Sequence, residues 1–383
     1  MKKPKKSIKK VLFFSPARSD FGIISNLISL FKQDKSIECS LIVTGSHLDK
    51  DFGNTKDEIP ASIYDKKYEI KTRNLGSEAT NSLIDGMSSM MLEVGQILFN
   101  IKPDLFIVLG DRQEILPACY CALLNRIPIA HIGGGDTTLG AIDNEIRHSV
   151  SQLSDYHFVT SQASESTLIG MNIPKEDIFY TGSPSDSKLI AMGKEKVSRK
   201  NLLKELGITE DRKIILCTFH PETKNDKSFN ELRVFTQALE SLPSDEFIFI
   251  FTASNGDKEG FKFNKFIRKQ VLATSNFYFF ESLGIDLYLR TMKCSVLVAG
   301  NSSSGLHEAP SLKVPTLDVG NRQQGRLRGD SVLNVKPNKS AIIKGIRKLI
   351  DSKEDCNFHN PYIKGSDSSK EIYKTLKRKL NKS

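Results

Sequence analysis

The chain has 383 residues, of which 39% are hydrophobic and 26% charged, and its net charge is +10. This length exceeds what one ordinary hydrophobic core holds, so two domains are expected. No apolar run is long enough to span a membrane, and the run Val11–Phe14 after the basic N-terminus is too short for a secretory signal. We therefore expect a cytoplasmic protein without a membrane partner.

The positive charge is concentrated at the two ends of the chain. The first ten residues hold six lysines, and residues 370–383 hold six basic residues and one glutamate, which leaves 43 basic and 44 acidic residues between them. A nucleic-acid-binding protein more often carries its basic residues on the folded body, with aromatic residues between them. The distribution argues against a nucleic acid partner and favours solvated basic ends.

The cysteines form no CxxC pair, and most of them lie in apolar runs, where cysteine behaves as a small buried hydrophobic residue. This arrangement predicts reduced thiols rather than disulfides or a zinc site. They are Cys39, Cys119, Cys121, Cys217, Cys294 and Cys356.

Short apolar runs, each followed by a polar turn, recur along the first half of the chain and are typical of buried parallel strands. They fall at residues 11–14, 39–45, 105–109, 127–132, 156–161 and 178–183. Helical spacing covers 23–33 and 82–100, with Arg18 in the loop before the first of these helices. Residues 51–80 are polar and irregular, which indicates either a flap over a cleft or a plain surface loop. The N-terminal domain is predicted to span residues 1–184.

The same alternation begins again at Lys213, after a charged helical connector at residues 185–212. Apolar runs lie at residues 213–219, 247–254, 277–283, 296–305 and 314–323. The C-terminal domain is predicted to span residues 185–365 and to be followed by a basic surface helix or tail, 366–383, that frays at its end. The predicted fold is α/β, with two Rossmann-like domains facing each other across a cleft.

Four acidic residues lie at or soon after strand ends within Leu105–His148, namely Asp111, Asp136, Asp143 and Glu145. The carboxyl ends of strands in open α/β sheets face the ligand crevice. Several carboxylates in one cleft have separated pKa values, so that one can accept a proton while another donates one. The alternative is structural: such acids also serve as turn residues and helix caps, Asp143 in particular.

Three consecutive serines, Ser302, Ser303 and Ser304, follow a predicted strand and open a helix. Backbone N–H groups, the helix dipole and three hydroxyls together favour an anion. Glu308 follows where a carboxylate can accept hydrogen bonds from ribose hydroxyls. Neither a Walker loop nor a GxGxxG motif is present, so a nucleoside diphosphate donor or leaving group is favoured over ATP hydrolysis. A capped helix without a ligand is the alternative.

Basic residues also follow the predicted strands. Arg18, His220 and Arg322 come soon after apolar runs, and Arg326 and Arg328 lie in a glycine-flanked loop. Guanidinium groups suit phosphate or carboxylate ligands. For Arg18, a surface arginine without a ligand is an equally open interpretation.

Six ordered motifs between about Val11 and Val335 together resemble the hydrolysing UDP-N-acetylglucosamine 2-epimerases of the sialic-acid and legionaminic-acid type. The motifs lie in Gly110–Arg112, Ala130–Asp136, Ala141–His148, Phe219–Thr223, Asn301–Pro310 and Gly320–Arg328. The resemblance implies the two-domain GT-B fold, a UDP-sugar substrate, no metal or redox cofactor, and a homodimer or homotetramer. It also implies a reaction in which UDP is eliminated to leave a 2-acetamidoglucal, which then takes up water.

The resemblance also implies roles for individual residues. Asp111, Asp136 and Asp143 stand where the family has its essential acids; one would be the base and another the reprotonating acid. His220 would meet the diphosphate and assist the departure of UDP.

Further residues of these motifs would bind the nucleotide or substrate. Arg18 and the three serines would hold phosphate, Glu308 would accept from the ribose hydroxyls, and Arg322 would lie beside the nucleotide. The remaining arginines with an implied binding role are Arg112, Arg147 and Arg326.

The chain departs from the family at one motif. Members usually have His-Gly-Gly-Glu or Glu-Gly-Gly-Glu where this chain has Gly133-Gly134-Gly135-Asp136. The acid is one methylene shorter, and proton transfer requires hydrogen-bond reach. The departure indicates a shifted substrate, a larger 4-substituted sugar or a slower enzyme.

The leading hypothesis is conversion of UDP-N-acetylglucosamine to N-acetylmannosamine and UDP for nonulosonic acid biosynthesis. The same chemistry on a UDP- or GDP-linked 2,4-diacetamido-trideoxy sugar is the near alternative. A GT-B glycosyltransferase would share fold and nucleotide site, but it needs no cluster of acids to move a carbon-bound proton. A non-catalytic nucleotide-sugar binding protein and a nonhydrolysing epimerase are the remaining alternatives.

Overall fold

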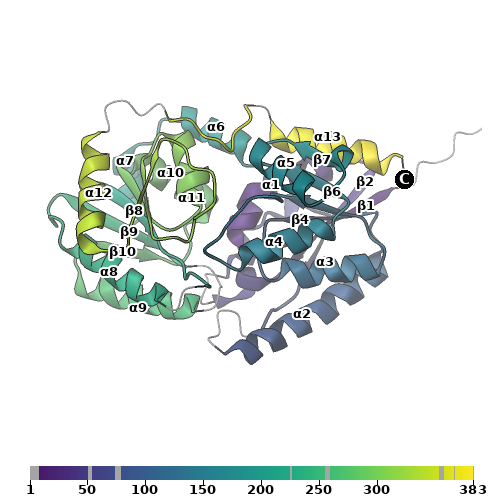
Figure 1. The fold of residues 1–383 in the computed structure, drawn as a ribbon, viewed down its shortest axis with the longest axis horizontal. Coiled ribbons are helices and arrows are strands. Elements are labelled where there is room, and N and C mark those ends of the chain that lie inside the picture. The colour runs from purple at the N-terminus through teal and green to yellow at the C-terminus, as the bar shows by residue number, and fades with distance from the viewer. Residues whose placement is uncertain are drawn as a thin grey trace, which may run out of the picture.

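The computed structural model describes residues 8–50, 54–73, 79–224, 227–254, 259–352, 358–365 and 367–382. Two separate parallel sheets, each flanked by helices, form the two halves of the molecule (Figure 1). The predicted α/β fold with two Rossmann-like domains is confirmed.

The first sheet has seven strands in the order β3-β2-β1-β4-β5-β6-β7. Its strands are β1 (Lys9–Ser15), β2 (Ile37–Val43), β3 (Lys66–Glu69), β4 (Leu105–Leu109), β5 (Ile129–Ile132), β6 (Tyr156–Val159) and β7 (Ile178–Tyr180). Its helices are α1 (Arg18–Gln33), α2 (Thr80–Ile101), α3 (Ile115–Leu124), α4 (Asp143–Gln152) and α5 (Gln162–Gly170). All five residues of β4 are buried, because helices cover both faces of the sheet.

The second sheet has six strands in the order β10-β9-β8-β11-β12-β13. Its strands are β8 (Lys213–Thr218), β9 (Phe247–Thr252), β10 (Phe277–Phe280), β11 (Leu297–Gly300), β12 (Thr316–Val319) and β13 (Val332–Val335). Its helices are α6 (Asp186–Lys194), α7 (Arg199–Glu205), α8 (Ser228–Glu240), α9 (Gly260–Ala273), α10 (Gly284–Cys294), α11 (Ser304–His307) and α12 (Lys339–Asp351). Single 3₁₀ turns are η1 (Gly45–Leu48), η3 (Thr55–Glu58), η4 (Ala61–Ile63), η5 (Lys175–Asp177) and η6 (Ala309–Leu312).

The last helix, α13 (Ser368–Leu380), returns from the second half and packs against the first (Figure 1). Ile372, Leu376 and Leu380 are buried in the same core cluster as Phe31 of α1. The ring of Tyr373 meets Phe31 edge-on at 5.2 Å. The predicted surface helix is therefore an integral part of the N-terminal half, because its apolar face has a partner there.

Several local expectations differ from the structure. Arg18, expected in a loop, is the first residue of α1. Residues 51–80 include the edge strand β3, whose sequence KKYE shows no apolar run; residues 51–53 and 74–78 lie outside the described part. β13 was not predicted at all. The five described cysteines are free, as predicted, and Cys356 lies outside the described residues.

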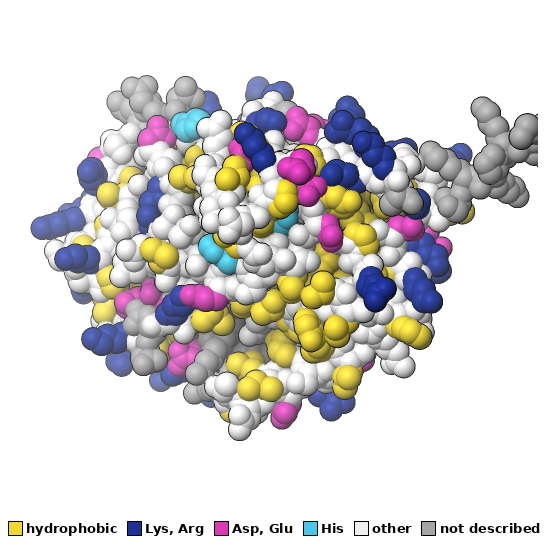
Figure 2. All heavy atoms as spheres, turned by 45° about the vertical axis from the view of Figure 1, so that its right-hand side comes forward, with side chains coloured by type: hydrophobic (Ala, Val, Ile, Leu, Met, Phe, Trp, Pro, Cys, Tyr) yellow, Lys and Arg dark blue, Asp and Glu magenta, His cyan; other side chains and the backbone are white. Residues whose placement is uncertain are grey.

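Helices α2 and α3 share an apolar surface that faces away from the sheet, here called the α2–α3 apolar surface. It consists of Ile84, Leu92, Phe99, Tyr120, Leu123 and Leu124, each at least 46% exposed. Figure 2 shows hydrophobic side chains gathered on the lower part of this face of the molecule. None of the helices in the described ranges is long and apolar enough to cross a membrane.

Candidate active site

The two sheets face each other at equivalent points of their topology. In each, the strand order reverses beside the first strand, between β1 and β4 and between β8 and β11, where ligands bind in open α/β sheets. A cavity of about 520 Å³ lies between these two points. Eleven predicted site residues line it: Arg18, Asp111, Arg112, Asp143, His220, Ser302, Ser303, Ser304, Glu308, Arg322 and Arg326.

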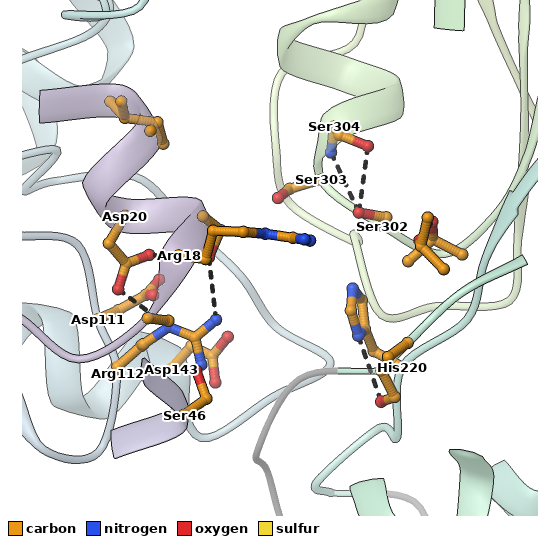
Figure 3. A pocket seen from close by; sticks show the side chains of 18 of the residues that line it. Arg18, Asp20, Ser46, Asp111, Arg112, Asp143, His220, Ser302, Ser303 and Ser304 are labelled. Carbon is orange, nitrogen blue, oxygen red and sulfur yellow. Dashed lines mark hydrogen bonds and ion pairs between the residues drawn. The ribbon is translucent and has the colours of Figure 1, made fainter. Parts of the chain in front are cut away.

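The guanidinium groups of two arginines lie at the N-terminal end of α1: Arg18 is its first residue, and Arg112 reaches it from the loop after β4. The side chain of Arg18 points across the cleft toward residues Ser302–Ser304, here called the serine loop (Figure 3), and donates to Ser282 of the other domain. Burial lowers the pKa of Arg18, against the opposing effect of Glu58. The Nε of Arg112 lies 3.0 Å from Asp20 Oδ2, which holds this guanidinium against the first turn of α1.

Asp111 lies between cations from both domains. Its Oδ2 forms an ion pair with Arg147 of α4 and is 3.5 Å from Nη2 of Arg326. The Arg147 side chain is only 2% exposed, and its Nη1 also donates to Asp136 O at 2.6 Å and to Thr138 Oγ1 at 3.1 Å. Arg147 was predicted to bind substrate, but it does not line the cavity; instead its guanidinium orients Asp111.

The other two acids have different surroundings. Asp143 is the first residue of α4 and lines the cavity, with its Oδ2 3.9 Å from Arg322 Nη2. Asp136 does not line the cavity, and its Oδ1 accepts hydrogen bonds from the hydroxyls of Thr160 and Ser164. Burial raises the pKa of Asp136 despite these hydrogen bonds, which favours its protonated form.

Two glycines without side chains, Gly110 and Gly133, lie near Asp111 and Asp136 in the sequence. Gly110 and Gly133 end the neighbouring strands β4 and β5 with φ values of +78° and +79°. Among the described residues, a Cβ on Gly110 would meet no heavy atom within 4 Å, and one on Gly133 only Gly110 N at 4.0 Å. Space therefore remains open beside the backbone of these two glycines.

On the opposite wall, His220 follows β8 and is tied to Asn301, which follows β11. The His220 N–H donates to Asn301 Oδ1 at 2.7 Å, and Asn301 Nδ2 donates back to His220 O at 2.8 Å. The Nδ1 of His220 lies 3.4 Å from Ser254 Oγ. Burial, together with the charges of Arg322 and Arg112, lowers the pKa of His220 well below its ordinary value. The imidazole is therefore neutral at pH 7.

The serine loop lies beside His220 (Figure 3). The hydroxyls of Tyr288 and Ser304 are hydrogen-bonded at 2.6 Å, and Ser302 Oγ accepts from Ser304 N at 3.4 Å. Glu308 follows the short helix α11, and burial raises its pKa to about 8. The loop hydroxyls and the carboxyl of Glu308 here form a polar wall that can accept an anion and its ribose.

Contacts between the domains close one side of the cleft. Leu139 N donates to Gln324 O at 2.8 Å, and Lys224 is 2.6 Å from Glu145. Glu145, predicted among the acids of the cleft, is thus an exposed partner of the other domain. Gly140 leaves no room for a side chain, since a Cβ there would lie 2.5 Å from Asn321 O.

Two residues that shape the site could not be identified from the sequence pattern. Tyr288 lies in an ordinary amphipathic helix, and Thr138 in a polar loop; both act only through tertiary contacts. Within the described residues, no group of three or more His, Cys, Asp and Glu side chains is placed to hold a metal ion.

Fold and site together define a two-domain nucleotide-sugar enzyme of the GT-B-like type. The family of UDP-N-acetylglucosamine 2-epimerases matches residues 30–377, and the chain belongs to this family.

Three curated relatives cover most of the chain. A GDP/UDP-N,N'-diacetylbacillosamine 2-epimerase (hydrolyzing) of Campylobacter jejuni is 33% identical over 337 residues, 87% of this chain and 85% of the relative. Polysialic acid biosynthesis protein P7 of Escherichia coli is 31% identical, covering 93% and 91%. A UDP-N,N'-diacetylbacillosamine 2-epimerase (hydrolyzing) of Legionella pneumophila is 29% identical, covering 97% and 96%.

The fold also matches a solved structure. The UDP-GlcNAc 2-epimerase of Neisseria meningitidis, solved bound to UDP-GlcNAc, superposes with a TM-score of 0.79 at 20% identity, covering 96% of this chain and all of that one. The resemblance to the hydrolysing epimerase family that the sequence motifs indicated is confirmed at the level of family and fold.

Proposed function

We propose that the chain is a hydrolysing 2-epimerase that converts a UDP-linked 2-acetamido sugar and water into UDP and the free 2-epimer. One observation carries the proposal: Asp111 and Asp143 line one wall of the cleft, and His220 faces them from the other (Figure 3). A transferase would need the nucleotide wall but not the acids. The ligand named for the Neisseria neighbour and the names of the relatives support a UDP-sugar as substrate.

The wall of the cleft formed by the second domain carries groups that suit the diphosphate and the ribose of a nucleotide. The hydroxyls of Ser302–Ser304 and the guanidinium of Arg18 provide hydrogen-bond donors for the diphosphate. Glu308 lines the cavity close by and can accept hydrogen bonds from the ribose. Burial and the neighbouring arginines lower the pKa of His220, whereas a nearby diphosphate would favour its protonated form, which can hydrogen-bond the departing UDP oxygen.

The acids then divide the proton transfers. In the first step a carboxylate takes the proton from carbon 2, the C–H electrons form the double bond to carbon 1, and the bond to UDP breaks with its electrons on the oxygen. We assign this base role to Asp143, because it lines the cavity. In the second step the oxygen of water bonds to carbon 1 and the water gives up a proton to solvent, while the electrons of the double bond take up a proton at carbon 2 from the other face. Two acids are the candidates for the donor: Asp111, which lines the cavity, and Asp136, whose pKa burial raises although it does not line the cavity.

Two nucleotide sugars are candidates for the substrate. UDP-N-acetylglucosamine is the leading expectation from the sequence motifs. Two features instead favour a UDP-linked 2,4-diacetamido-trideoxy sugar, which we propose as the preferred substrate. The Campylobacter and Legionella relatives are named for such a sugar. The second feature is the motif Gly133–Asp136, where a glycine replaces the larger residue usual in the family and the acid is one methylene shorter. UDP-N-acetylglucosamine is the second candidate, supported by the ligand named for the Neisseria neighbour.

NMR in D₂O with each of the two UDP-sugars, and with the GDP-linked diacetamido sugar, tests the proposal. The expected products are UDP and an equal amount of free 2-epimer carrying deuterium at carbon 2, with the higher kcat/KM for the UDP-linked diacetamido sugar. Asp143→Asn should abolish deuterium incorporation and UDP release together.

The other outcomes separate the alternatives. A higher kcat/KM for UDP-N-acetylglucosamine would overturn the substrate assignment and leave the reaction intact. An epimer still linked to UDP would identify a nonhydrolysing enzyme. UDP release only after addition of an acceptor sugar would identify a glycosyltransferase, and binding without turnover of any of the three would contradict catalysis.

A further inference from the structure

An aromatic pair lies beside the catalytic end of the cleft. His307 is the last residue of α11, and its ring stacks on Tyr362 with centroids 3.7 Å apart and planes at 24°. Tyr362 belongs to the segment that leads from the second domain to α13. It is 1% exposed, and its hydroxyl donates to Leu327 O at 3.0 Å. The imidazole is thus held on a ring that is itself fixed.

His307 offers a lone pair to an arginine of the site. Its Nε2 lies 3.2 Å from Nη1 of Arg326. A guanidinium only donates, so Nε2 must accept and the ring proton must be on Nδ1. Burial and the charges of Arg326 and Arg147 lower the pKa of His307 well below its ordinary value. The ring therefore keeps this lone pair at neutral pH.

All three nitrogens of the Arg326 guanidinium are directed by partners. Nε donates to Thr138 Oγ1 at 2.9 Å, Nη1 to His307, and Nη2 lies 3.5 Å from Asp111 Oδ2. Thr138 and Asp111 belong to the first domain, whereas His307 is the partner on Arg326's own domain. His307 therefore fixes the direction of the guanidinium independently of the contacts across the cleft.

We propose that His307, stacked on Tyr362, is a positioning residue that aims Arg326 at Asp111 and so prepares the catalytic end of the cleft. The inference rests on the proposed function in that it assigns Arg326 to the sugar end rather than to the diphosphate. A charge held in place before the reaction stabilises charge in the transition state without reorganisation. Without His307, Nη1 loses its acceptor and the guanidinium can turn away from Asp111.

Two substitutions separate the hydrogen bond from the stacking. His307→Phe keeps an aromatic ring on Tyr362 and removes the acceptor. His307→Gln removes the ring but places an amide oxygen as many bonds from Cβ as Nε2 is. Tyr362→Phe is the matched control, because it keeps the stack and loses only the bond to Leu327.

We expect His307→Phe to lower kcat by about ten- to a hundredfold, since misplacement of a reacting group by about 1 Å has such effects. KM and the affinity for UDP, measured by calorimetry, should stay within about twofold of the wild type. His307→Gln should retain most of the wild-type kcat, and Tyr362→Phe should change kcat by less than about threefold. An unchanged kcat in His307→Phe, a parallel loss of UDP affinity, or an equal loss of kcat in His307→Gln would each overturn the proposal.

A measurement without substrate keeps this inference separate from the proposed function. The ¹⁵N NMR spectrum of the histidines should show His307 with an unprotonated Nε2 and a protonated Nδ1 near neutral pH; the opposite tautomer would overturn the positioning role. If the enzyme turns over none of the sugars but this tautomer is present, the proposed function fails while the contact to Arg326 stands.

Discussion

Replacing Asp111 by asparagine should destabilise the N-terminal half as well as stop the reaction. The carboxylate is the charged partner of Arg147, whose side chain is 2% exposed. Removing one partner of a buried ion pair costs about 3–5 kcal/mol, because the other charge remains buried without compensation. The Asp111 side chain is 18% exposed, so we expect the lower end of this range. Arg326, 3.5 Å from Asp111 Oδ2, would add to the cost by repelling Arg147.

Asp143→Asn is the matched control. Asp143 has the same 18% side-chain exposure, but its ion pair with Arg322 is 3.9 Å long. Its loss should cost less than about 1 kcal/mol. Since about 1 kcal/mol corresponds to roughly 2–4 °C in a domain of this size, Asp111→Asn should melt about 6–12 °C below the wild type and Asp143→Asn within about 3 °C of it. Both variants should lose deuterium incorporation.

Thermal unfolding followed by circular dichroism and calorimetry measures the difference. In the double variant Asp111→Asn/Arg147→Met neither charge remains, so its melting temperature should lie above that of Asp111→Asn alone. The reasoning fails if Asp111→Asn melts within 3 °C of the wild type, or if adding Arg147→Met lowers the melting temperature further.

Three more changes test other parts of the molecule. With a folded-state pKa of about 8, above the ordinary 4.5, Glu308 keeps its proton while the unfolded chain loses it, so wild-type stability falls as pH rises through this window. The melting temperature of Glu308→Gln should therefore exceed that of the wild type by a margin that grows from pH 5 to pH 8; a constant margin would contradict the raised pKa. Gly140→Ala places a Cβ 2.5 Å from Asn321 O, so kcat/KM should fall up to about a hundredfold while small-angle scattering shows a larger radius of gyration; an unchanged radius would refute the closure argument. On the α2–α3 apolar surface, Leu92→Glu should dissociate the expected homo-oligomer in light-scattering measurements, whereas Leu272→Glu, at a 90% exposed leucine of α9, should not; equal masses would place the interface elsewhere.

The strands and the loops after them could be predicted from the sequence because both sheets are parallel and covered on both faces. Such strands are continuous apolar runs, and the residues that follow them necessarily lie at one edge of the sheet. That is why Asp111, His220 and the serine loop could be assigned to one cleft before the structure was known. The edge strand β3 lacks this signal: its sequence KKYE is partly exposed and polar, so nothing distinguishes it from a loop.

What the sequence could not predict depends on how distant segments meet. Arg147 looks like a substrate-binding residue by its motif, and only the docking of α4 shows its guanidinium behind Asp111. His307 and Tyr362 are 55 positions apart and come together because the chain returns to the first half through the segment before α13. The same return buries one face of α13, whose run of basic residues looks like a solvated end in the sequence.

The arrangement of charges implies that the catalytic set is complete only when the domains are in contact. Asp111 has one cation from its own domain, Arg147, and one from the other, Arg326, and the hydroxyl of Thr138 accepts from both arginines. In an open cleft Asp111 would keep only the buried Arg147, and Arg326 would keep only His307. Contact between the domains therefore brings a second positive charge to Asp111 and places His220 opposite the acids. In the proposed reaction, loss of the leaving group and movement of the carbon-bound proton would be coupled in this way, because the proposed nucleotide wall and the acids belong to different domains.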